Sequence, residues 1–530
     1  MKTSENLSQN QPTTTDELLT EEAKLLRLQM ENDVLKVELN WYKEQYELSK
    51  RKLFGTSSEK TPYEDQLNFF NEAEVTSDPS VPEPDVIDVV YNHSVQKASS
   101  KDKLKDLPVE RIEYTLTEEE LVCPVCDSDL HQMTTEIRRE LTVIPAQVKI
   151  VEHVRSIYSC RSCEANEENA TIIKADMPKS ILPKSMVSPT LLAHIIHNKF
   201  VLGTPLYRQE QEFKRNRIPI SRQNMANWVI HGSNEYLVHL YDHLHKCFLK
   251  KDIAHADETD IQVLHEDGRE AQQKSKMWVY ATSHTDEMIC LYDYRTTRAG
   301  KHAENFLKGF HGFLHTDGFS GYNQVPNVEL VACLAHVRRK FDEAKTAVGK
   351  DSESVRYIKA KEGLDYCSKL FKLEEQWKDL SIEERFNKRQ EEMKPLLDAF
   401  FTWLKEIKKA ALPKSKLGEA VTYAINQWPK IINVLKDGRL ELSNNRAERL
   451  VKPFVINRKN FLFCNTAKGA RSSAIAQSIV ETAKGNNLNV FQYLTFLFER
   501  LPNIDLSNEE ELDKLLPWSK DLPVELRIKS

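Results

Sequence analysis

The fold of this chain is decided by five short apolar segments, which read DIAHADET (252–259), KMWVYATS (276–283), EMICLYDY (287–294), GFLHTDG (312–318) and VELVACL (328–334). Each segment is rich in β-branched or aromatic residues, and turn-forming residues separate it from the next. This pattern predicts five strands. A helical segment, HAENFLKGF (302–310), lies between the third strand and the fourth. We therefore expect an α/β fold at the centre of the protein.

Helical patterns flank these strands on both sides. Residues 188–248 have helical periodicity, residues 336–440 are helical and highly charged, and helices continue to about residue 500. Only 15 of the 530 residues are Gly, and long stretches are rich in Leu, Lys and Glu, which favours helix. A chain of this length forms roughly three or four domains.

The composition is that of an ordinary globular protein, with 40% hydrophobic and 29% charged residues. No apolar run is long enough to span a bilayer, and the polar N-terminus lacks the apolar core of a secretory signal. We expect a cytoplasmic protein that does not contact a membrane. The net charge of −6 argues against a nucleic-acid partner. However, residues 59–90 are heavily acidic, while residues 446–471 carry seven Lys or Arg and one Glu, and local fields decide binding.

Residues 18–54 show a heptad pattern. The a positions are Leu25, Asn32, Leu39, Tyr46 and Leu53, and the d positions include Leu28, Leu35 and Tyr42, with Ser49 breaking the series. A polar Asn at one a position fixes the register of a two-stranded coiled coil. We therefore expect a homo-oligomer formed through this coiled coil. The alternative is an amphipathic helix that packs on its own domain.

The nine cysteines fall into two groups. Cys123, Cys126, Cys160 and Cys163 form two Cys-x-x-Cys pairs, while the other five are scattered and are expected to be buried thiols. Two such pairs supply the four thiolates of a tetrahedral, structural Zn²⁺ site. The alternative is two unconnected pairs of reduced cysteines. Between the pairs, RRELTVIP (138–145) and VKIVEHVRSIYS (148–159) alternate in polarity and could form a β-hairpin that carries the second pair.

Residues 204–230 predict two helices joined by a turn. The first helix should end near Asn216, Pro219 blocks its continuation, and Ser221 is a good N-cap for the second helix. Arg222, Gln223 and Asn224 would then begin the second helix, where the recognition residues of a helix-turn-helix contact base edges. An ordinary αα-hairpin is an equally good interpretation.

Three carboxylates are candidates for a catalytic metal site. Asp257 closes the strand segment DIAHAD, Asp317 closes GFLHTD, and Glu448 lies in LSNNRAERLVKP, a short helix that we expect Ser443 to cap and Pro453 to stop. Hard oxygen ligands suit Mg²⁺ or Mn²⁺, and two such ions can promote an in-line displacement at phosphorus. Glu258 and Asp260 should face away from Asp257, because strand side chains alternate.

Each of these residues also has an ordinary explanation. Asp317 and Gly318 form a common turn dipeptide, and Glu448 can pair with Lys452 on a solvent-exposed helix face. His336, in CLAHVRRKF, is interpreted as a residue that packs its helix, with a place near the site or on DNA as the alternative. Six basic residues are candidate contacts to DNA phosphates or else solvated surface charges: Arg338, Arg339, Lys340, Lys452, Arg458 and Lys459.

Seven blocks of the sequence, in this order, resemble the insertion-sequence-66 transposase family. They are RKLFGTSSEK (51–60), CPVC with CRSC (123–126 and 160–163), LYRQEQEFKRNRIPISRQNMANWV (206–229), HADETD (255–260), FLHTDGFSGYN (313–323), ACLAHVRRKF (332–341) and LSNNRAERLVKPFVINRKNFLF (442–463). The resemblance covers nearly the whole chain. Many members carry Asp where Ser443 stands and a strongly basic linker where this chain has QKASSKDKLKD.

The resemblance implies a zinc-containing DDE transposase with an RNase H-like catalytic core. Asp257, Asp317 and Glu448 match its catalytic triad, which would bind two Mg²⁺ or Mn²⁺ ions, and the four paired cysteines match its zinc-binding domain. The partners implied are DNA, as element ends and as target, and possible accessory proteins of the same element. Because the chain between Asp317 and Glu448 is too long for a compact core, a helical insertion should lie there.

The resulting interpretation divides the chain into eight segments. They are an N-terminal coiled coil (1–58), an acidic flexible linker (59–109), a zinc-binding β domain (110–176), a helical, helix-turn-helix-like DNA-binding region (177–249), the first part of the RNase H-like core (250–342), a helical insertion (343–440), the Glu-bearing part of the core (441–485) and a C-terminal helical tail (486–530). The expected activity is metal-dependent cleavage and strand transfer of an insertion sequence. The alternatives are a catalytically silent DNA-binding regulator and an RNase H-like nuclease without joining activity.

Overall fold

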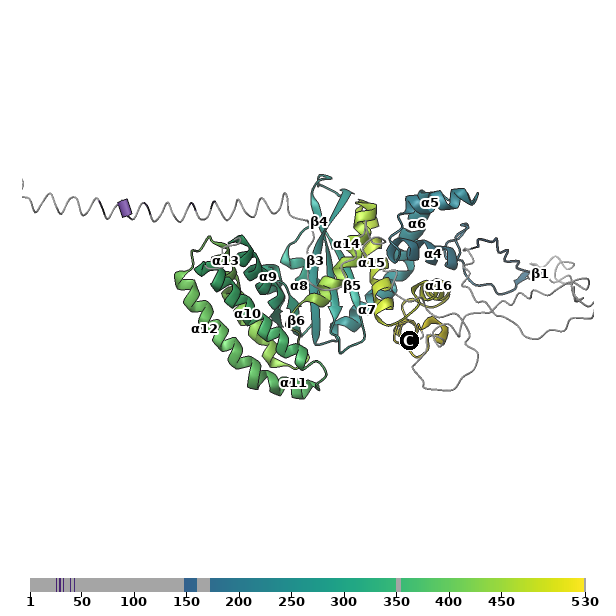
Figure 1. Cartoon of the computed structure of the whole chain (residues 1–530). Coiled ribbons are helices and arrows are strands. Elements are labelled where there is room, and N and C mark those ends of the chain that lie inside the picture. The colour runs from purple at the N-terminus through teal and green to yellow at the C-terminus, as the bar shows by residue number, and fades with distance from the viewer. Residues whose placement is uncertain are drawn as a thin grey trace, which may run out of the picture. The chain divides into compact units, whose positions relative to one another are not determined.

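The computed structural model describes residues 147–159, 172–348 and 354–528, together with Leu25, Leu28, Gln29, Asn32, Leu39 and Tyr42 near the N-terminus. The chain divides into two compact units: Ser57–Asp176 form one, and Met1–Thr56 with Met177–Ser530 form the other. The larger unit combines a mixed sheet with many helices (Figure 1). The predicted α/β class is therefore confirmed.

A six-stranded sheet lies at the centre of the larger unit, in the order β5-β4-β3-β6-β7 with β8 paired to β3. Three strands, β3, β4 and β5, are antiparallel neighbours, and β6 and β7 run parallel to β3. The five predicted strands are confirmed as β3 (Ile253–His265), β4 (Lys274–Thr282), β5 (Cys290–Arg295), β6 (Gly312–Thr316) and β7 (Val328–Ala332). The short β8 (Cys464–Thr466) was not expected from the sequence.

The side chains of β3 contribute to three hydrophobic cores, and Ile261 and Val263 belong to the one that they share with β4 and β5. Ala254 and Ala256 belong to a core that is shared with the helices from the N-terminal side of the sheet and with α15 and α16. Ile253 faces the opposite way, into the core of the helices that follow β7. Because β3 is buried on both faces, it forms the rigid centre on which the candidate residues are placed.

Four helices precede the sheet: α4 (Pro189–Phe200), α5 (Leu206–Arg215), α6 (Arg222–His231) and α7 (Val238–Leu249). The predicted helix, turn and helix are confirmed as α5 and α6. Asn216 is the C-cap of α5, and the Ser221 hydroxyl accepts the backbone N–H of Asn224 as the N-cap of α6. The structure therefore supports the predicted geometry of this region, while its role in binding DNA stays a prediction.

Helix α8 (Gly300–Phe306) lies between β5 and β6, as expected, but it ends four residues before the predicted boundary. Gly309 has a φ of +94°, a backbone conformation that glycine adopts without steric cost. The chain therefore leaves the helix and turns toward β6, while Phe310 remains buried in the core.

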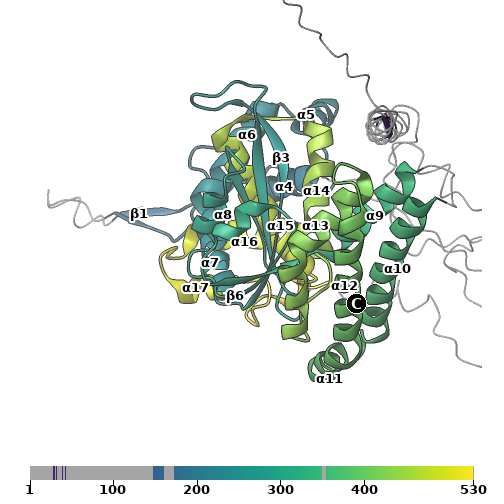
Figure 2. The same cartoon turned by 90° about the vertical axis from the view of Figure 1, so that its left-hand side faces the viewer.

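The helices between β7 and α14 pack around their own core (Figures 1 and 2). They are α9 (Leu334–Ala347), α10 (Val355–Gln376), α11 (Ile382–Lys388), α12 (Lys394–Ala410) and α13 (Lys416–Ile431). Arg389, which is fully buried, donates to the carbonyls of Val434, Asp437 and Leu440 and forms an ion pair with Glu374. This side chain fastens the helices to the segment that leads into α14.

Helix α14 (Asn445–Phe461) corrects two details of the sequence interpretation. Its N-cap is Asn444 rather than Ser443, and the helix continues through Pro453 instead of ending there. A proline inside a helix removes one backbone hydrogen bond. Tertiary contacts compensate for it here, because Phe454 and Asn457 are buried beyond the proline and the Asn457 amide donates to the carbonyl of Phe200.

Two helices complete the larger unit, α15 (Ala467–Gly485) and α16 (Val490–Arg500), and the short α17 (Glu509–Asp513) follows. Helix α15 covers the edge strand β5: Ser478 accepts the backbone N–H of Tyr292, and Thr482 accepts that of Cys290. Edge strands expose unpaired backbone groups that can recruit other chains, so this helix closes the sheet on that side. None of the helices in the described ranges is long and apolar enough to cross a membrane.

In the smaller unit, β1 (Ile157–Ser159) pairs with β2 (Ile172–Lys174) in an antiparallel ladder. The residues between them, 160–171, include Cys160 and Cys163. The pairing partner found for the end of the VKIVEHVRSIYS segment is thus Ile172–Lys174, while RRELTVIP lies outside the described residues.

Near the N-terminus of the chain, Leu25, Leu28 and Leu39 are helical and more than half exposed.

Candidate active site

The register of the central strands places the two candidate aspartates at the same level of the sheet. The ladder between β3 and β6 pairs His255 with His315. Asp257 and Asp317 each follow two residues later, so their backbones lie side by side. Asp317 stands just beyond the end of β6, as expected, whereas Asp257 lies within β3, which continues to His265 because β4 and β8 pair with it there.

Asn444 anchors the start of α14 to these strands. Its side-chain amide donates to the carbonyl of Ala256 (2.8 Å), and its Oδ1 lies 3.1 Å from Nδ1 of the buried His255. Its backbone N–H donates to the Cys333 sulfur (3.1 Å) at the end of β7. Glu448 follows one helical turn later, and its backbone N–H donates to the Asn444 carbonyl. The side chain of Asn444 thus serves the sheet rather than the helix cap, and it brings Glu448 to the aspartates.

The charges of the three carboxylates act on one another. Burial, together with the negative charges of Glu258, Asp317 and Glu448, raises the pKa of Asp257 to about 7, against one backbone hydrogen bond that lowers it. The structure therefore brings Asp257, Asp317 and Glu448 into one electrostatic cluster. Each negative charge in such a cluster disfavours the ionised form of its neighbours.

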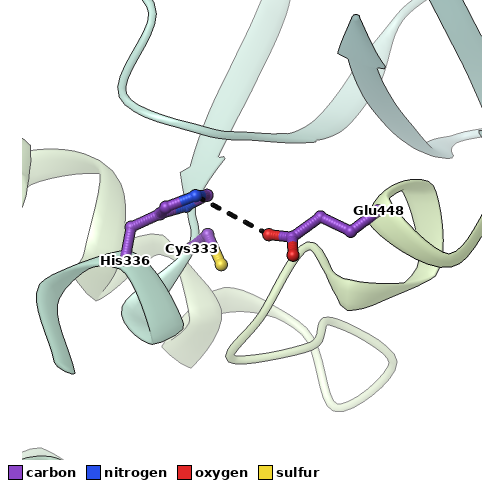
Figure 3. A group of neighbouring side chains, drawn as sticks. All are labelled: Cys333, His336 and Glu448. Atoms are coloured by element: carbon purple, nitrogen blue, oxygen red, sulfur yellow. Dashed lines mark ion pairs between the residues drawn. The ribbon is translucent and has the colours of Figure 1, made fainter. Parts of the chain in front are cut away.

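His336 and Cys333 adjoin Glu448, as Figure 3 shows. The imidazole Nε2 of His336 lies 3.7 Å from Glu448 Oε1. Burial lowers the pKa of His336, while the nearby Glu448 charge opposes that shift. The interpretation of His336 as a helix-packing residue is wrong, because its ring faces the carboxylate cluster from the first turn of α9. The sequence offered no signal for the place of Cys333.

A cavity of about 390 Å³ opens beside Asp317 and is bordered by basic side chains. Arg339 Nη2 lies 3.9 Å from Glu448, and Lys340 lies 4.9 Å from the ring centroid of Tyr423. Gly318 is required here for space, because a Cβ atom would lie 2.5 Å from the Tyr423 hydroxyl oxygen. The residues that line the cavity are Arg298, Asp317, Gly318, Phe319, His336, Arg339, Lys340, Glu343 and Tyr423.

Arg298 is a site residue that the sequence analysis missed. It lies in the loop before α8, its guanidinium stacks 4.0 Å above the Phe319 ring, and its Nη2 lies 3.7 Å from Asp317 Oδ2. It also forms an ion pair with Glu258, whose other oxygen accepts the Tyr322 hydroxyl (2.8 Å). The basic loop sequence RTTRAGK (295–301) was the available signal.

Glu258 faces away from Asp257, as strand alternation predicts, yet it is not isolated from the site. Burial raises the pKa of Glu258, and so does the charge of Asp317. Arg298 lies beside both carboxylates and so links Glu258 electrostatically to Asp317. Asp260 is different, because Lys276 and Lys274 pair with it at the rim of β3 and lower its pKa against the effect of burial. Asp260 is therefore the better matched control residue for experiments on Asp257.

The residues of the cluster fit a divalent cation with hard oxygen ligands. Glu448 Oε1 is buried and has no hydrogen-bond partner among the described residues. Burial and the neighbouring negative charges favour the protonated form of Asp257, and a bound cation would favour its ionised form. Carboxylates are the side-chain ligands that Mg²⁺ and Mn²⁺ prefer. The cluster therefore could hold such an ion.

The other predicted DNA contacts are dispersed over the larger unit. Arg222, Gln223 and Asn224 are exposed at the start of α6, Arg338 is exposed on α9, and on α14 Lys452 and Lys459 are exposed while Arg458 is half-buried. None of these seven lines the cavity. The zinc candidates Cys123, Cys126, Cys160 and Cys163 lie outside the described residues.

Four models of transposase-related families match successive parts of this chain. The model of the "Transposase IS66 family" matches residues 184–472, which contain all three carboxylates. A "zinc-finger binding domain of transposase IS66" matches residues 120–164, an "IS66 C-terminal element" matches residues 478–518, and a model described as "Transposase C of IS166 homeodomain" matches residues 41–112. The zinc-finger match supports zinc binding by the segment that contains the paired cysteines.

Similar proteins occur in Sinorhizobium fredii (strain NBRC 101917 / NGR234). The uncharacterized protein y4hP is 28% identical over 424 residues, which are 77% of this chain and 74% of that protein. The uncharacterized protein y4jD is 27% identical over 429 residues, which are 78% of this chain and 81% of that protein. The family match covers more than half of the chain, including the sheet, its carboxylates and the helices between them, and so the chain belongs to the IS66 family of transposases.

Proposed function

We propose that this protein is a DNA transposase that cleaves and joins DNA strands at a metal site formed by Asp257, Asp317 and Glu448. The observation that carries the proposal is the convergence of these residues from three distant segments, with the pKa of Asp257 raised to about 7 by burial and by its neighbours. Buried like charges are costly unless a cation or a substrate uses them. Membership of a transposase family agrees with this chemistry.

Bound Mg²⁺ or Mn²⁺ ions would activate the attacking oxygen and stabilise the leaving oxygen of a phosphodiester displacement. The residues of the chain hold and orient this site. Asn444 positions Glu448 through β3, and the backbone N–H of Phe319 donates to Asp317 Oδ1 (2.8 Å), which orients that carboxylate. Arg298 approaches Asp317 from the side of the cavity.

We propose that Arg298, Arg339 and Lys340 contact DNA phosphates at the cavity. All three border it, and a guanidinium or ammonium group at this place can offset the repulsion between DNA and the carboxylates. Helices α5 and α6, together with the zinc-finger segment, would supply contacts to the element ends. These modules favour a transposase over a simple nuclease, because a nuclease without joining activity has no need to hold two specific ends.

We also propose that the sheet is an RNase H-like core and that α10–α13 are an insertion within it. The support is the order of the elements: three antiparallel strands, then two strands parallel to the first, and then the long helical segment before the helix that carries Glu448. The predicted coiled coil would join two copies of the chain, since Leu25, Leu28 and Leu39 are exposed.

The test uses DNA that contains the element ends, a target duplex and Mg²⁺. Changing Asp257, Asp317 or Glu448 to Ala should abolish both cleavage and joining, while binding of the ends persists, because that binding depends on other surfaces and on salt-sensitive phosphate contacts. Asp260→Ala is the matched control and should retain activity.

Three outcomes separate the alternatives. Wild-type protein that binds ends and never cuts them would indicate a silent regulator. Cleavage without joining would indicate a nuclease. Full activity in Glu448→Ala would show that another residue completes the site.

A further inference from the structure

Cys333, His336 and Glu448 bring three different kinds of metal ligand to one point. Their ligand atoms all lie within 4.8 Å of one another (Figure 3). Cys333 follows β7 as the N-cap of α9, His336 lies in the first turn of α9, and Glu448 projects from α14. The set consists of a sulfur, an imidazole nitrogen and a carboxylate oxygen, which is a ligand combination that Zn²⁺ accepts and Mg²⁺ does not.

The geometry is close to that of a tetrahedral site. Metal bonds of about 2.0 Å to nitrogen and oxygen would place these two ligand atoms about 3.3 Å apart. His336 Nε2 and Glu448 Oε1 are 3.7 Å apart, so a shift of a few tenths of an ångström is sufficient for this pair.

The polar atoms of the group leave room for an ion. Glu448 Oε1, one of the proposed ligand atoms, is buried and has no hydrogen-bond partner among the described residues. The sulfur of Cys333 already accepts the backbone N–H of Asn444 (3.1 Å), a contact that stabilises a metal-bound thiolate and holds it in place. The ligands are therefore supported by the same backbone that positions Glu448.

We propose that Cys333, His336 and Glu448 form a site for Zn²⁺ that competes with the magnesium site for Glu448. The binding of zinc needs only these three side chains. Its consequence rests on the proposed function, because an ion held through the thiolate draws the carboxylate of Glu448 away from Asp257 and Asp317. Zinc then acts as an inhibitor of strand cleavage, while Mg²⁺, which does not bind thiolate, leaves the group open.

The binding test uses the full-length protein, with Co²⁺ as a spectroscopic substitute for Zn²⁺. Cobalt bound to a thiolate gives a charge-transfer band, and equilibrium dialysis counts the ions. The wild type should bind one more cobalt ion per chain than Cys333→Ser, and the difference spectrum should contain that band. His336→Gln should lose the same ion, which guards against a folding defect in the first variant. Cys367→Ser is the matched control, since Cys367 is also a buried thiol but lies in α10, outside the group.

The activity test measures Mg²⁺-dependent cleavage with and without added Zn²⁺, each variant serving as its own reference. Zinc should reduce the wild-type rate about tenfold or more and the Cys333→Ser rate less than twofold. Equal cobalt counts in the wild type and both variants would overturn the site. An extra ion without zinc inhibition would overturn the competition for Glu448. If no protein cleaves DNA with Mg²⁺ alone, the proposed function fails, whereas the cobalt counts still decide the site.

Discussion

The charge cluster around Asp257 makes a quantitative prediction about stability and pH. Replacing Asp257 with Asn removes one charge from a buried group of carboxylates and keeps the shape of the side chain. An acid whose pKa rises from 3.8 to about 7 on folding loses about 4 kcal/mol of stability once it is ionised. In the absence of divalent metal, the Asp257→Asn variant should therefore be more stable than the wild type at high pH.

The sign follows from proton binding in the two states. Between pH 4 and pH 7 the folded protein keeps the Asp257 proton, which the unfolded chain has already lost. The contribution of this group is thus complete below pH 3.8 and disappears as the pH rises through about 7. Between pH 5.5 and pH 8, the free energy of unfolding of the wild type should fall by about 2 kcal/mol relative to that of Asp257→Asn.

The assay is urea unfolding in EDTA, followed by tryptophan fluorescence, at these two pH values. Comparison between variants cancels the contributions of the other titrating groups to the pH dependence. Asp260→Asn serves as the control: the lysine partners of Asp260 lower its pKa, so removal of its charge should not stabilise the protein. At pH 8, Mg²⁺ at a hundred times its dissociation constant should restore about 2.7 kcal/mol to the wild type alone. A wild type and an Asp257→Asn variant with the same pH dependence would refute the account of the cluster.

Four further predictions concern other parts of the chain. Asn444→Ala should lower stability by about 2 kcal/mol and reduce cleavage more than DNA binding, because two buried hydrogen bonds that position Glu448 are lost. The exposed Asn445→Ala should do neither. Equal effects of the two variants in thermal unfolding and cleavage assays would contradict the role of Asn444. Arg298→Ala should destabilise the protein by about 2 kcal/mol, because Glu258 loses its ion-pair partner. In a double-mutant cycle, the second change Glu258→Gln should recover much of that loss. Strictly additive effects of the two changes would argue against coupling between Arg298 and Glu258. Cys160→Ala should release zinc, measured by elemental analysis, and should leave the catalytic core folded. A wild-type protein that contains no zinc after purification under reducing conditions would disprove the four-thiolate site. A peptide of residues 18–56 should be a helical dimer by circular dichroism and sedimentation, and Asn32→Leu should stabilise it while loosening its oligomeric state; a monomeric coil at high concentration would rule out the seam.

Local sequence patterns were sufficient where one element decides the outcome by itself. The five strands were predicted because each combines β-branched or aromatic residues with flanking turns, and Ser221 was predicted as a cap because a cap needs only its own side chain and the next turn of backbone. The three carboxylates were candidates from their positions near strand ends and on a helix. The resemblance to transposases, rather than a local pattern, selected them for the proposed catalytic role.

Local patterns failed where distant segments meet. Pro453 was expected to end α14, and it does not, because Phe454 and Asn457 bury their side chains against β5 and α4 beyond it. His336 was assigned to helix packing, since its own helix cannot reveal that α14 brings Glu448 to within 3.7 Å. Arg298 was overlooked because its partners are distant in the sequence: Glu258 lies in β3 and Asp317 follows β6.

The sequence by itself therefore determined the elements of this protein, their order and the identity of its carboxylates. The tertiary structure alone decided the raised pKa of Asp257, the residues that lie beside Glu448 and the residues that line the cavity. The physical reason is that strand and helix formation depend on neighbours in the chain. Burial, ion pairing and metal-ligand geometry depend instead on atoms that only the register of β3 with β6 and the anchoring of α14 by Asn444 bring together.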